Sequence, residues 1–242
     1  PATGPLYVEG AKPGDVLKVE ILDIALADYG VMTDAPNEGV IGAVLAEEST
    51  KLIPIRAGRA VFNDRLSFPI RPMIGVIGVA PAGESVPCGT PGDHGGNMDT
   101  IGIREGAILR LPVFVKGAYL GLGDLHAAMG DGEVSVTGLE VFGEVDLDLS
   151  LEKGASLPCP LLHDGDEVSF LASAETVDGA IHASTGYMHD FLLAKTSLNA
   201  DEALMLMSLC GHARISQIVD PLKTARFAMP VSVLAKFGVV VE

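Results

Sequence analysis

The sequence predicts a mainly β fold, sandwich- or barrel-like, followed by a small α+β unit at the C-terminal end. Its 242 residues include 29 glycines and 15 prolines, a frequency typical of short strands joined by tight turns. Residues 17–24 alternate between apolar and polar side chains, which is the period of a half-buried strand. After residue 175 apolar side chains recur at helical spacing, so we expect a β-rich region over residues 1–175 and an α+β unit over residues 176–242.

The β-rich region divides into several expected elements. Residues 70–80 form a nearly continuous apolar run, which predicts a buried strand. Residues 81–100 are rich in glycine and proline, and a loop of that length without periodicity is usually functional or disordered. Strands are also expected at residues 5–30, at residues 50–80, at residues 109–120, as one or two strands at residues 134–149, and as a pair at residues 151–175.

Two helices are expected in the C-terminal unit. Residues 184–195 carry apolar side chains at helical spacing. Asn199 followed three residues later by Glu202 is typical of a capping box, in which each side chain bonds the other residue's backbone N–H. Gly211 is well suited to end that second helix.

The composition excludes several classes of partner. The net charge is −16, and proteins that bind nucleic acid or anionic membranes need basic patches. The same acidity fits a soluble protein acting on neutral or cationic small molecules, although it could equally serve solubility alone. No apolar run reaches the roughly 20 residues of a membrane span. Three cysteines lie far apart without a CxxC pair, so we expect reduced thiols in a cytoplasmic protein.

Two short stretches concentrate the polar chemistry of the chain. Residues 92–99 (GDHGGNMD) and 123–133 (GDLHAAMGDGE) each combine Asp and His with several glycines. Glycine allows positive φ and close approach of the backbone to a ligand, and Asp and His bind metals or move protons. Because neither stretch alone carries enough groups for a site, we expect the two loops to line one pocket.

The same stretches, GDHGGNMDT and GDLHAAMGDGEV, resemble signature segments of the acetamidase/formamidase family, and the resemblance continues at residues 4–15 and 215–221. It implies a catalytic β-rich region that hydrolyses the C–N bond of short linear amides, formamide or acetamide, to a carboxylic acid and ammonia. Family members carry additional residues before the segment at 4–11. We therefore expect a separate N-terminal segment or a partner subunit against the first strand, and a homo-oligomer.

Asp124 and His126 form the clearest candidate metal site. They are two residues apart, and in an extended strand such side chains share a face. Oxygen and nitrogen ligands suit a divalent ion, with zinc the expected identity, and His94 or Asp99 could supply a third ligand. In the alternative interpretation, Asp124 and His126 only pair with each other in a polar turn.

Glu133 and Glu140 are the candidate general bases. Strand alternation places Glu133 on the polar face beside Asp131. It places Glu140 on the opposite face, pointing inward, unless a bulge at Gly138 swaps the faces. A buried carboxylate has a raised pKa, as a base working near neutral pH requires. The alternatives are a solvated rim carboxylate for Glu133 and a structural salt bridge for Glu140, to Lys116 or Arg110.

Gly95, Gly96 and Asn97 could direct N–H groups at a developing oxyanion, or could simply form a tight turn. A nucleophilic Cys88 is a weaker alternative, because nothing adjacent in sequence would lower its pKa. Together these residues predict hydrolysis by a metal-activated water. The rival functions are a non-catalytic β module that binds a small ligand or metal, and hydrolysis of a lactam or another cyclic amide.

Overall fold

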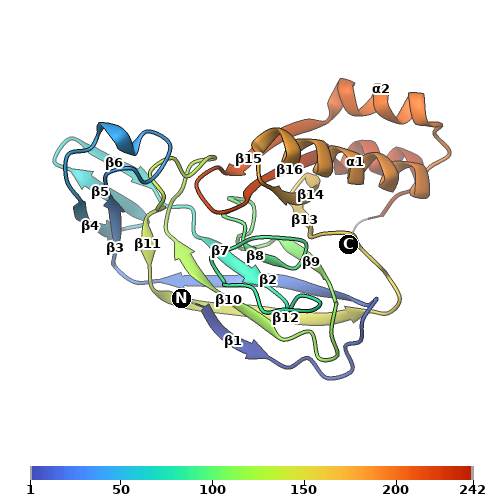
Figure 1. Cartoon of the computed structure of the whole chain (residues 1–242), viewed down its shortest axis with the longest axis horizontal. Helices are drawn as coiled ribbons and strands as arrows, with labels where there is room; N and C mark the ends of the chain where they lie inside the picture. The colour runs from blue at the N-terminus through green and yellow to red at the C-terminus, as the bar shows by residue number, and fades with distance from the viewer. Residues whose placement is uncertain (1, 241–242) are drawn as a thin grey trace.

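Two antiparallel sheets and a C-terminal helical layer make up the computed structural model, which describes residues 2–240 (Figure 1). The two sheets remain open rather than closing into a barrel, and the mainly β prediction is confirmed. The helices cover the end of the second sheet that is formed by the last strands of the chain, at the upper right of Figure 1.

The first sheet carries both glycine-rich stretches that the sequence singles out. Strand β1 pairs with the same edge of β10 as β11 does, and β10 in turn pairs with β7. The order of this sheet is β6 (Leu66–Pro69), β5 (Arg59–Asn63), β4 (Ser49–Arg56), β3 (Tyr29–Asp34), β11 (Glu140–Val141), β10 (Leu120–His126), β7 (Met73–Gly78) and β8 (Gly95–Asn97), with β1 (Ala2–Leu6) on β10.

The second sheet spans both parts of the expected division at residue 175. Its last two strands come from residues after 175, and they continue the sheet that β2 and β9 begin. The order is β12 (Gly143–Glu152), β2 (Val16–Leu26), β9 (Ile108–Pro112), β13 (Leu161–Asp164), β14 (Glu167–Ala174), β16 (Lys223–Pro230) and β15 (His212–Gln217).

Both expected helices are present, and the first is longer than expected. Helix α1 (Val177–Lys195) begins earlier than expected, where the Thr176 side chain accepts a hydrogen bond from the backbone of Gly179. Helix α2 (Ala200–Cys210) begins at the expected Asn199–Glu202 capping box. Short turns, η1 (Gly42–Val44), α3 (Val231–Leu234) and η2 (Ala235–Phe237), complete the helical content of residues 2–240. Among these residues no helix is long and apolar enough to cross a membrane.

Separate apolar cores stabilise the sandwich and the helical layer. Between the sheets, alternate residues of β2 and β9, such as Leu17 and Leu109, pack with Ile74 of β7 and are fully buried. Beneath the helices, Met188 of α1 packs with Phe170 of β14. Because burial of apolar surface is the main favourable contribution to folding, the first core holds the two sheets together and the second holds the helices on the second sheet.

Some expected strand boundaries were wrong. The strand predicted over residues 109–120 ends at Pro112, and the chain turns through left-handed Ala118 and Tyr119 before β10 begins. Residues 134–139 are not a strand, because Glu133 and Val136 also have positive φ and break the alternation. Within the loop at 81–100, residues 95–97 form the short strand β8 on β7. These irregular segments are the ones that carry the polar residues.

Candidate active site

The end of β10 places Asp124 and His126 at a shared site. Both side chains lie on one face, as expected, although Asp124 adopts a left-handed φ of 57° rather than a regular extended conformation. The His126 side chain is buried, while that of Asp124 is 23% exposed. The distance from His126 Nε2 to Asp124 Oδ2 is 3.7 Å.

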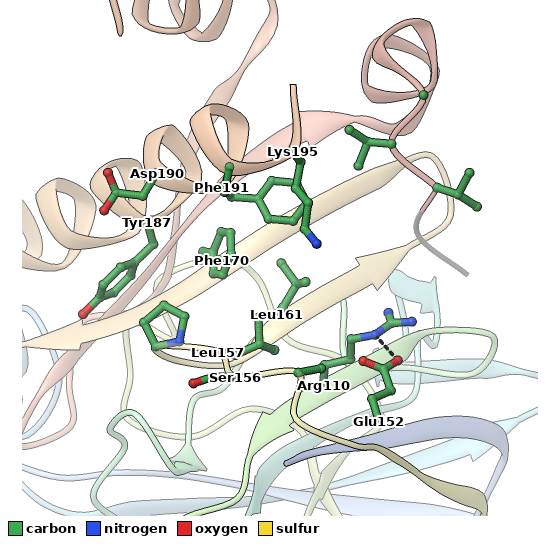
Figure 2. Close-up of a pocket in the computed structure, with 16 residues that line it drawn as sticks. Arg110, Glu152, Ser156, Leu157, Leu161, Phe170, Tyr187, Asp190, Phe191 and Lys195 are labelled. Atoms are coloured by element: carbon green, nitrogen blue, oxygen red, sulfur yellow. Dashed lines mark hydrogen bonds and ion pairs between the residues drawn. The ribbon is translucent and has the colours of Figure 1, made fainter. Parts of the chain in front are cut away.

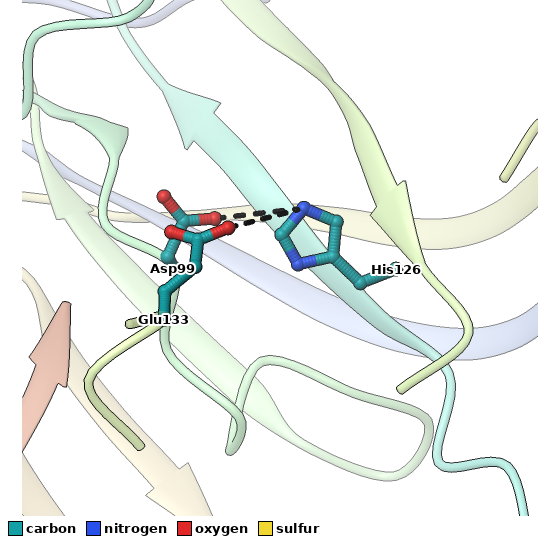
Figure 3. Close-up of side chains that lie close together, drawn as sticks. All are labelled: Asp99, His126 and Glu133. Carbon is teal, nitrogen blue, oxygen red and sulfur yellow. Dashed lines mark ion pairs between the residues drawn. The ribbon is translucent and has the colours of Figure 1, made fainter. Parts of the chain in front are cut away.

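Three further carboxylates surround the same ring nitrogen. His126 Nε2 lies 3.1 Å from Glu140 Oε1, 3.8 Å from Asp99 Oδ1 and 3.9 Å from Glu133 Oε1. Figure 3 shows the carboxylates of Asp99 and Glu133 side by side, both directed at this nitrogen. We call these five residues, Asp99, Asp124, His126, Glu133 and Glu140, the His126 cluster.

The cluster assembles because separate irregular segments meet over β7 and β10. Asp99 follows β8, where the backbone N–H groups of Met98 and Asp99 both donate to the carbonyl of Gly75. Glu133 lies in the loop after β10 and also has positive φ, while Glu140 opens β11 opposite His126 in the register. The sequence placed Glu133 and Glu140 on opposite faces, but the loop geometry brings both carboxylates to the same imidazole.

Glycines make this crowding sterically feasible. A β-carbon at Gly75 would stand 2.5 Å from Asp99 Oδ1 and 2.8 Å from Asp124 Oδ2. A β-carbon at Gly138 would stand 2.5 Å from His126 Nδ1. Real β-carbons do not approach other atoms so closely, so larger residues at either position would displace the side chains of the cluster.

The donor atoms of the cluster fit a divalent cation. Both carboxylate oxygens of Asp99 and both ring nitrogens of His126 are buried and make no hydrogen bond within residues 2–240. Two sets of ligand atoms lie within 4.8 Å of one another, Asp99–His126–Glu133 and Asp124–His126–Glu140. Leaving such polar atoms buried without a partner is costly, and one imidazole nitrogen with several carboxylates is a donor set suited to zinc and similar ions.

The pKa shifts within the His126 cluster agree with a site suited to a divalent cation. Burial raises the pKa of Asp99 well above its usual range, and the charge of Glu133 adds to the shift. Burial likewise raises the pKa of both Glu133 and Glu140. Burial alone would lower the pKa of His126, but the carboxylates of Asp124 and Glu140 outweigh it and raise that pKa to about 11. Without a cation, protons must balance this charge.

A second layer of contacts contains a residue to which sequence reasoning gave no role. Asp220 Oδ2 accepts a hydrogen bond of 2.9 Å from Asn97 Nδ2. Burial, and next the charge of Glu133, raise the pKa of Asp220 to about 7. Asp220 belongs to the segment at 215–221 that carries part of the family resemblance. An acidic residue in that segment could have identified it as a candidate site residue.

Gln217 and Arg226 tie the C-terminal strands to the loops of the cluster. The Gln217 side chain accepts hydrogen bonds from the backbone of Val219 and Asp220, which fixes the turn that presents the Asp220 carboxylate. Arg226 is 4% exposed and donates to both oxygens of Asp131, two residues before Glu133. The C-terminal strands therefore position part of the site.

The structure does not bring His94 to the cluster. The Val79 N–H donates to the His94 carbonyl, whereas His126 pairs with Met73 at the other end of β7. Six residues of strand separate those points, about 20 Å at roughly 3.3 Å per residue. His94 instead lines a cavity of about 630 Å³ with Tyr119 and the exposed thiol of Cys88.

Two of the three expected oxyanion donors, on Gly95 and Asn97, are already engaged. The Gly95 N–H donates to the Gly92 carbonyl, and the Asn97 side-chain amide donates to Asp220. Gly96 packs close to His94, because a β-carbon there would lie 3.1 Å from His94 Nε2. These residues shape the loop and orient Asp220.

One cavity adjoins the His126 cluster directly. It has a volume of about 420 Å³, and Glu133 and Gly138 form part of its wall. Met32, Phe68 and Leu139 contribute apolar side chains to the same cavity. It is large enough for a small organic molecule to lie with one end against Glu133.

The largest cavity described, about 900 Å³, lies elsewhere. Figure 2 shows Phe191 of α1 above Phe170 and Leu161, Tyr187 of α1 to their left, and the Arg110–Glu152 ion pair at the lower right. No residue of the His126 cluster lines it. This cavity is therefore separate from the His126 cluster, although it is larger than the cavity beside Glu133.

A buried imidazole among four carboxylates, held over an open antiparallel sandwich, is a group of side chains that could hold a metal ion. Residues 83–236 match the acetamidase/formamidase family, and the chain belongs to that family.

Three relatives show how far the similarity extends. A formamidase of Methylophilus methylotrophus is 28% identical over 211 residues, covering 62% of this chain and 51% of the relative. An acetamidase of Mycolicibacterium smegmatis is 27% identical over 219 residues, with coverage of 63% and 53%. A crystal structure of a predicted acetamidase/formamidase from Thermoanaerobacter tengcongensis is 48% identical, with a TM-score of 0.98, covering 100% of this chain and 80% of that one. The match thus spans about half the length of the curated relatives.

Proposed function

We propose that this chain forms the catalytic part of an amidohydrolase that converts short linear amides, such as formamide and acetamide, to a carboxylic acid and ammonia. The observation that carries the proposal is the His126 cluster, four carboxylates gathered around one imidazole nitrogen in a member of this family. The names of the curated relatives, formamidase and acetamidase, support the substrate class.

We assign the binding of a divalent cation, zinc by preference, to His126, Asp99 and Asp124. The support is chemical: His126 and Asp99 present buried atoms without hydrogen bonds, and Asp124 Oδ2 faces the same nitrogen. Imidazole favours zinc over magnesium or calcium, while carboxylates accept any of these ions. A cation held there would supply Lewis-acid stabilisation of negative charge and a lowered pKa for water.

Glu133 is the better candidate for the general base. Its carboxylate lines the cavity that adjoins the cluster, and burial raises its pKa toward the range a base requires. Glu140 Oε1 instead accepts a hydrogen bond from the Gly138 N–H and lies 3.1 Å from His126. We therefore assign Glu140 to orienting the imidazole.

Hydrolysis then needs two proton transfers at Glu133. In the first, Glu133 accepts a proton from water as the water oxygen bonds to the amide carbon, which leaves negative charge on the former carbonyl oxygen. In the second, Glu133 delivers that proton to the amide nitrogen, the C–N bond breaks, and ammonia leaves. One carboxylate thus serves as base and then as acid, for which a raised pKa is suited.

The cavity beside Glu133 supports a small substrate. Met32, Phe68 and Leu139 would face the acyl group, while the polar end of the amide would point toward Glu133. Such a cavity would accept acyl groups of a few carbons without charged substituents.

The test is ammonia release from a panel of amides, measured before chelation, after chelation and after adding back zinc. We expect formamide, acetamide and propionamide to be hydrolysed, activity to disappear on chelation, and zinc to restore it. Turnover of lactams alone would favour the cyclic-amide alternative. Stoichiometric metal binding without turnover of any amide would favour a non-catalytic binding module.

The division of roles along the chain and the assembly of the protein are further parts of this proposal. We propose that residues 1–175 carry the catalytic groups and residues 176–242 brace them through Asp220 and Arg226. We also propose a cytoplasmic homo-oligomer in which another segment or subunit pairs with β1, whose residues are all exposed. Intact-mass and light-scattering measurements on the native protein would test the assembly.

A further inference from the structure

Half of the arginines in this acidic chain line one small cavity. Arg71, Arg104, Arg214 and Arg226 face a space of about 130 Å³ between the first sheet and strands β14–β16, together with Ser169 of β14. We call this the arginine pocket. Since the chain has a net charge of −16, gathering four guanidinium groups at one place calls for a negative counterpart.

Three of these arginines already have carboxylate partners. Arg104 donates to Asp164, Arg214 forms a two-point pair with Glu167, and Arg226 pairs with Asp131. Each pair uses only part of the five N–H donors that a guanidinium carries. The carboxylates therefore hold the guanidinium planes in place. Arg226 also donates through Nη1 to the Ile215 carbonyl and the Ser216 hydroxyl, so the N–H donors that remain lie mainly on Arg104 and Arg214.

Arg71 and Ser169 make no such contacts. Within residues 2–240 the Arg71 side chain has no ion pair or hydrogen bond, so it leaves one net positive charge after the three pairs are counted. The Ser169 residue is 5% exposed, and its hydroxyl makes no hydrogen bond within the same residues. A charged donor and a hydroxyl of a mostly buried residue thus face one space together.

We propose that the arginine pocket binds a small oxyanion of the carboxylate or inorganic phosphate type. Its volume equals that of about four water molecules at roughly 30 Å³ each, which suits an anion of a few heavy atoms. Planar guanidinium forks bind pairs of anionic oxygens with short, charge-assisted hydrogen bonds. Arg71 supplies the net charge, and Ser169 supplies a neutral hydrogen bond.

The arginine pocket also adjoins the cavity beside Glu133. Arg71 and Met129 line both cavities. A carboxylate released by the proposed hydrolysis would therefore be one source of the anion, and free phosphate would be another. Binding itself does not depend on the hydrolytic proposal, because the pocket contains no residue of the His126 cluster.

Ligand-observed NMR titration of the intact protein would test this inference, with inorganic phosphate and acetate as separate probes. We expect saturable binding of at least one probe. Arg71→Gln should weaken it roughly 10–100-fold, the value of a charge-assisted hydrogen bond. Ser169→Ala should weaken it by a smaller factor. Arg56→Gln, which removes an exposed arginine of β4 outside the pocket, should leave binding unchanged.

The preferred probe identifies the source of the anion. Tighter acetate binding would point to the reaction product, and tighter phosphate binding to free phosphate. Absence of saturable binding for both probes would overturn the proposal. So would equal affinity in the wild type and Arg71→Gln, or a loss in Arg71→Gln that Ser169→Ala does not share, because the anion would then lie in the cavity beside Glu133.

Discussion

A β-carbon at Gly75 would stand 2.5 Å from Oδ1 of Asp99, the most buried carboxylate of the cluster. Only the absence of a side chain on β7 leaves room for that oxygen beside Asp124 and His126. The close approach also explains why Asp99 reaches the cluster from a loop: its own N–H donates to the Gly75 carbonyl. Strand β7 and the loop that carries Asp99 are thus hydrogen-bonded to each other at Gly75, where the carboxylates converge.

Gly75→Ala should therefore disrupt the site more than the fold. Forcing a methyl group into this space costs about 1–3 kcal/mol of stability and moves Asp99. We expect at least a roughly tenfold loss of metal affinity, measured by competition with a chromogenic chelator. Gly186→Ala is the control, because that helix position has open space; it should add about 0.5–1 kcal/mol to stability without affecting metal binding.

Removing the imidazole should abolish metal binding. His126→Ala deletes the single nitrogen ligand shared by both candidate ligand sets, and amide turnover should fall by more than roughly 100-fold. Metal content by elemental analysis and circular dichroism of the fold would be measured together. His182→Ala, an exposed histidine of α1, should behave as the wild type. Full activity in a metal-free His126→Ala protein would refute a metal-dependent mechanism.

The two glutamates should respond differently to replacement by glutamine. Glu133→Gln removes the proposed base with little change in shape, so turnover should fall roughly 10²–10⁴-fold while the metal remains bound. Glu140→Gln keeps an oxygen that can accept from the Gly138 N–H, so the loss should be much smaller. Steady-state kinetics with metal analysis would separate the variants, and the reverse order would assign the base to Glu140.

Stability of the metal-free protein should decline as pH rises. The folded-state pKa of Asp220 is raised to about 7 and that of His126 to about 11. A group with a raised pKa binds its proton more tightly when folded, so its stabilising contribution is present at low pH and lost as pH rises. The loss begins near pH 4 for Asp220 and near pH 6.5 for His126, the values expected for the unfolded chain.

Thermal unfolding of the chelated protein between about pH 5 and about pH 9 would measure this decline. Zinc-loaded protein should lose less stability over the same range, because a bound cation replaces the protons that the cluster otherwise holds. A metal-free protein that gains stability with pH would contradict the electrostatic description of the cluster.

The capping box of α2 should contribute to stability without influencing catalysis. Asn199 accepts from the Glu202 N–H, and Glu202 accepts from the Asn199 N–H. Asn199→Ala should cost about 1 kcal/mol in urea unfolding and leave amide turnover unchanged. Ser208→Ala, at an exposed position in the same helix, should be neutral or slightly stabilising.

Patterns within a few residues of sequence predicted several strands and helices, and they predicted the Asp124–His126 pair of the site. The alternation over residues 17–24 corresponds to β2, and the Asn199–Glu202 spacing corresponds to the start of α2. Asp124 and His126 lie close together, as their two-residue spacing predicts, although the left-handed φ of Asp124 departs from regular strand geometry. Each of these outcomes depends on neighbours within a few residues, where backbone geometry restricts the choices.

Only the tertiary structure decided which distant residues join that pair. Asp99 reaches His126 because β8 pairs with β7, and His94 does not, because the same pairing carries it to the far end of the strand. Asn97 meets Asp220 across 123 positions of sequence. Strand order, sheet register and left-handed loop residues set these distances. They result from packing of the whole chain, so spacing along the sequence could not determine them.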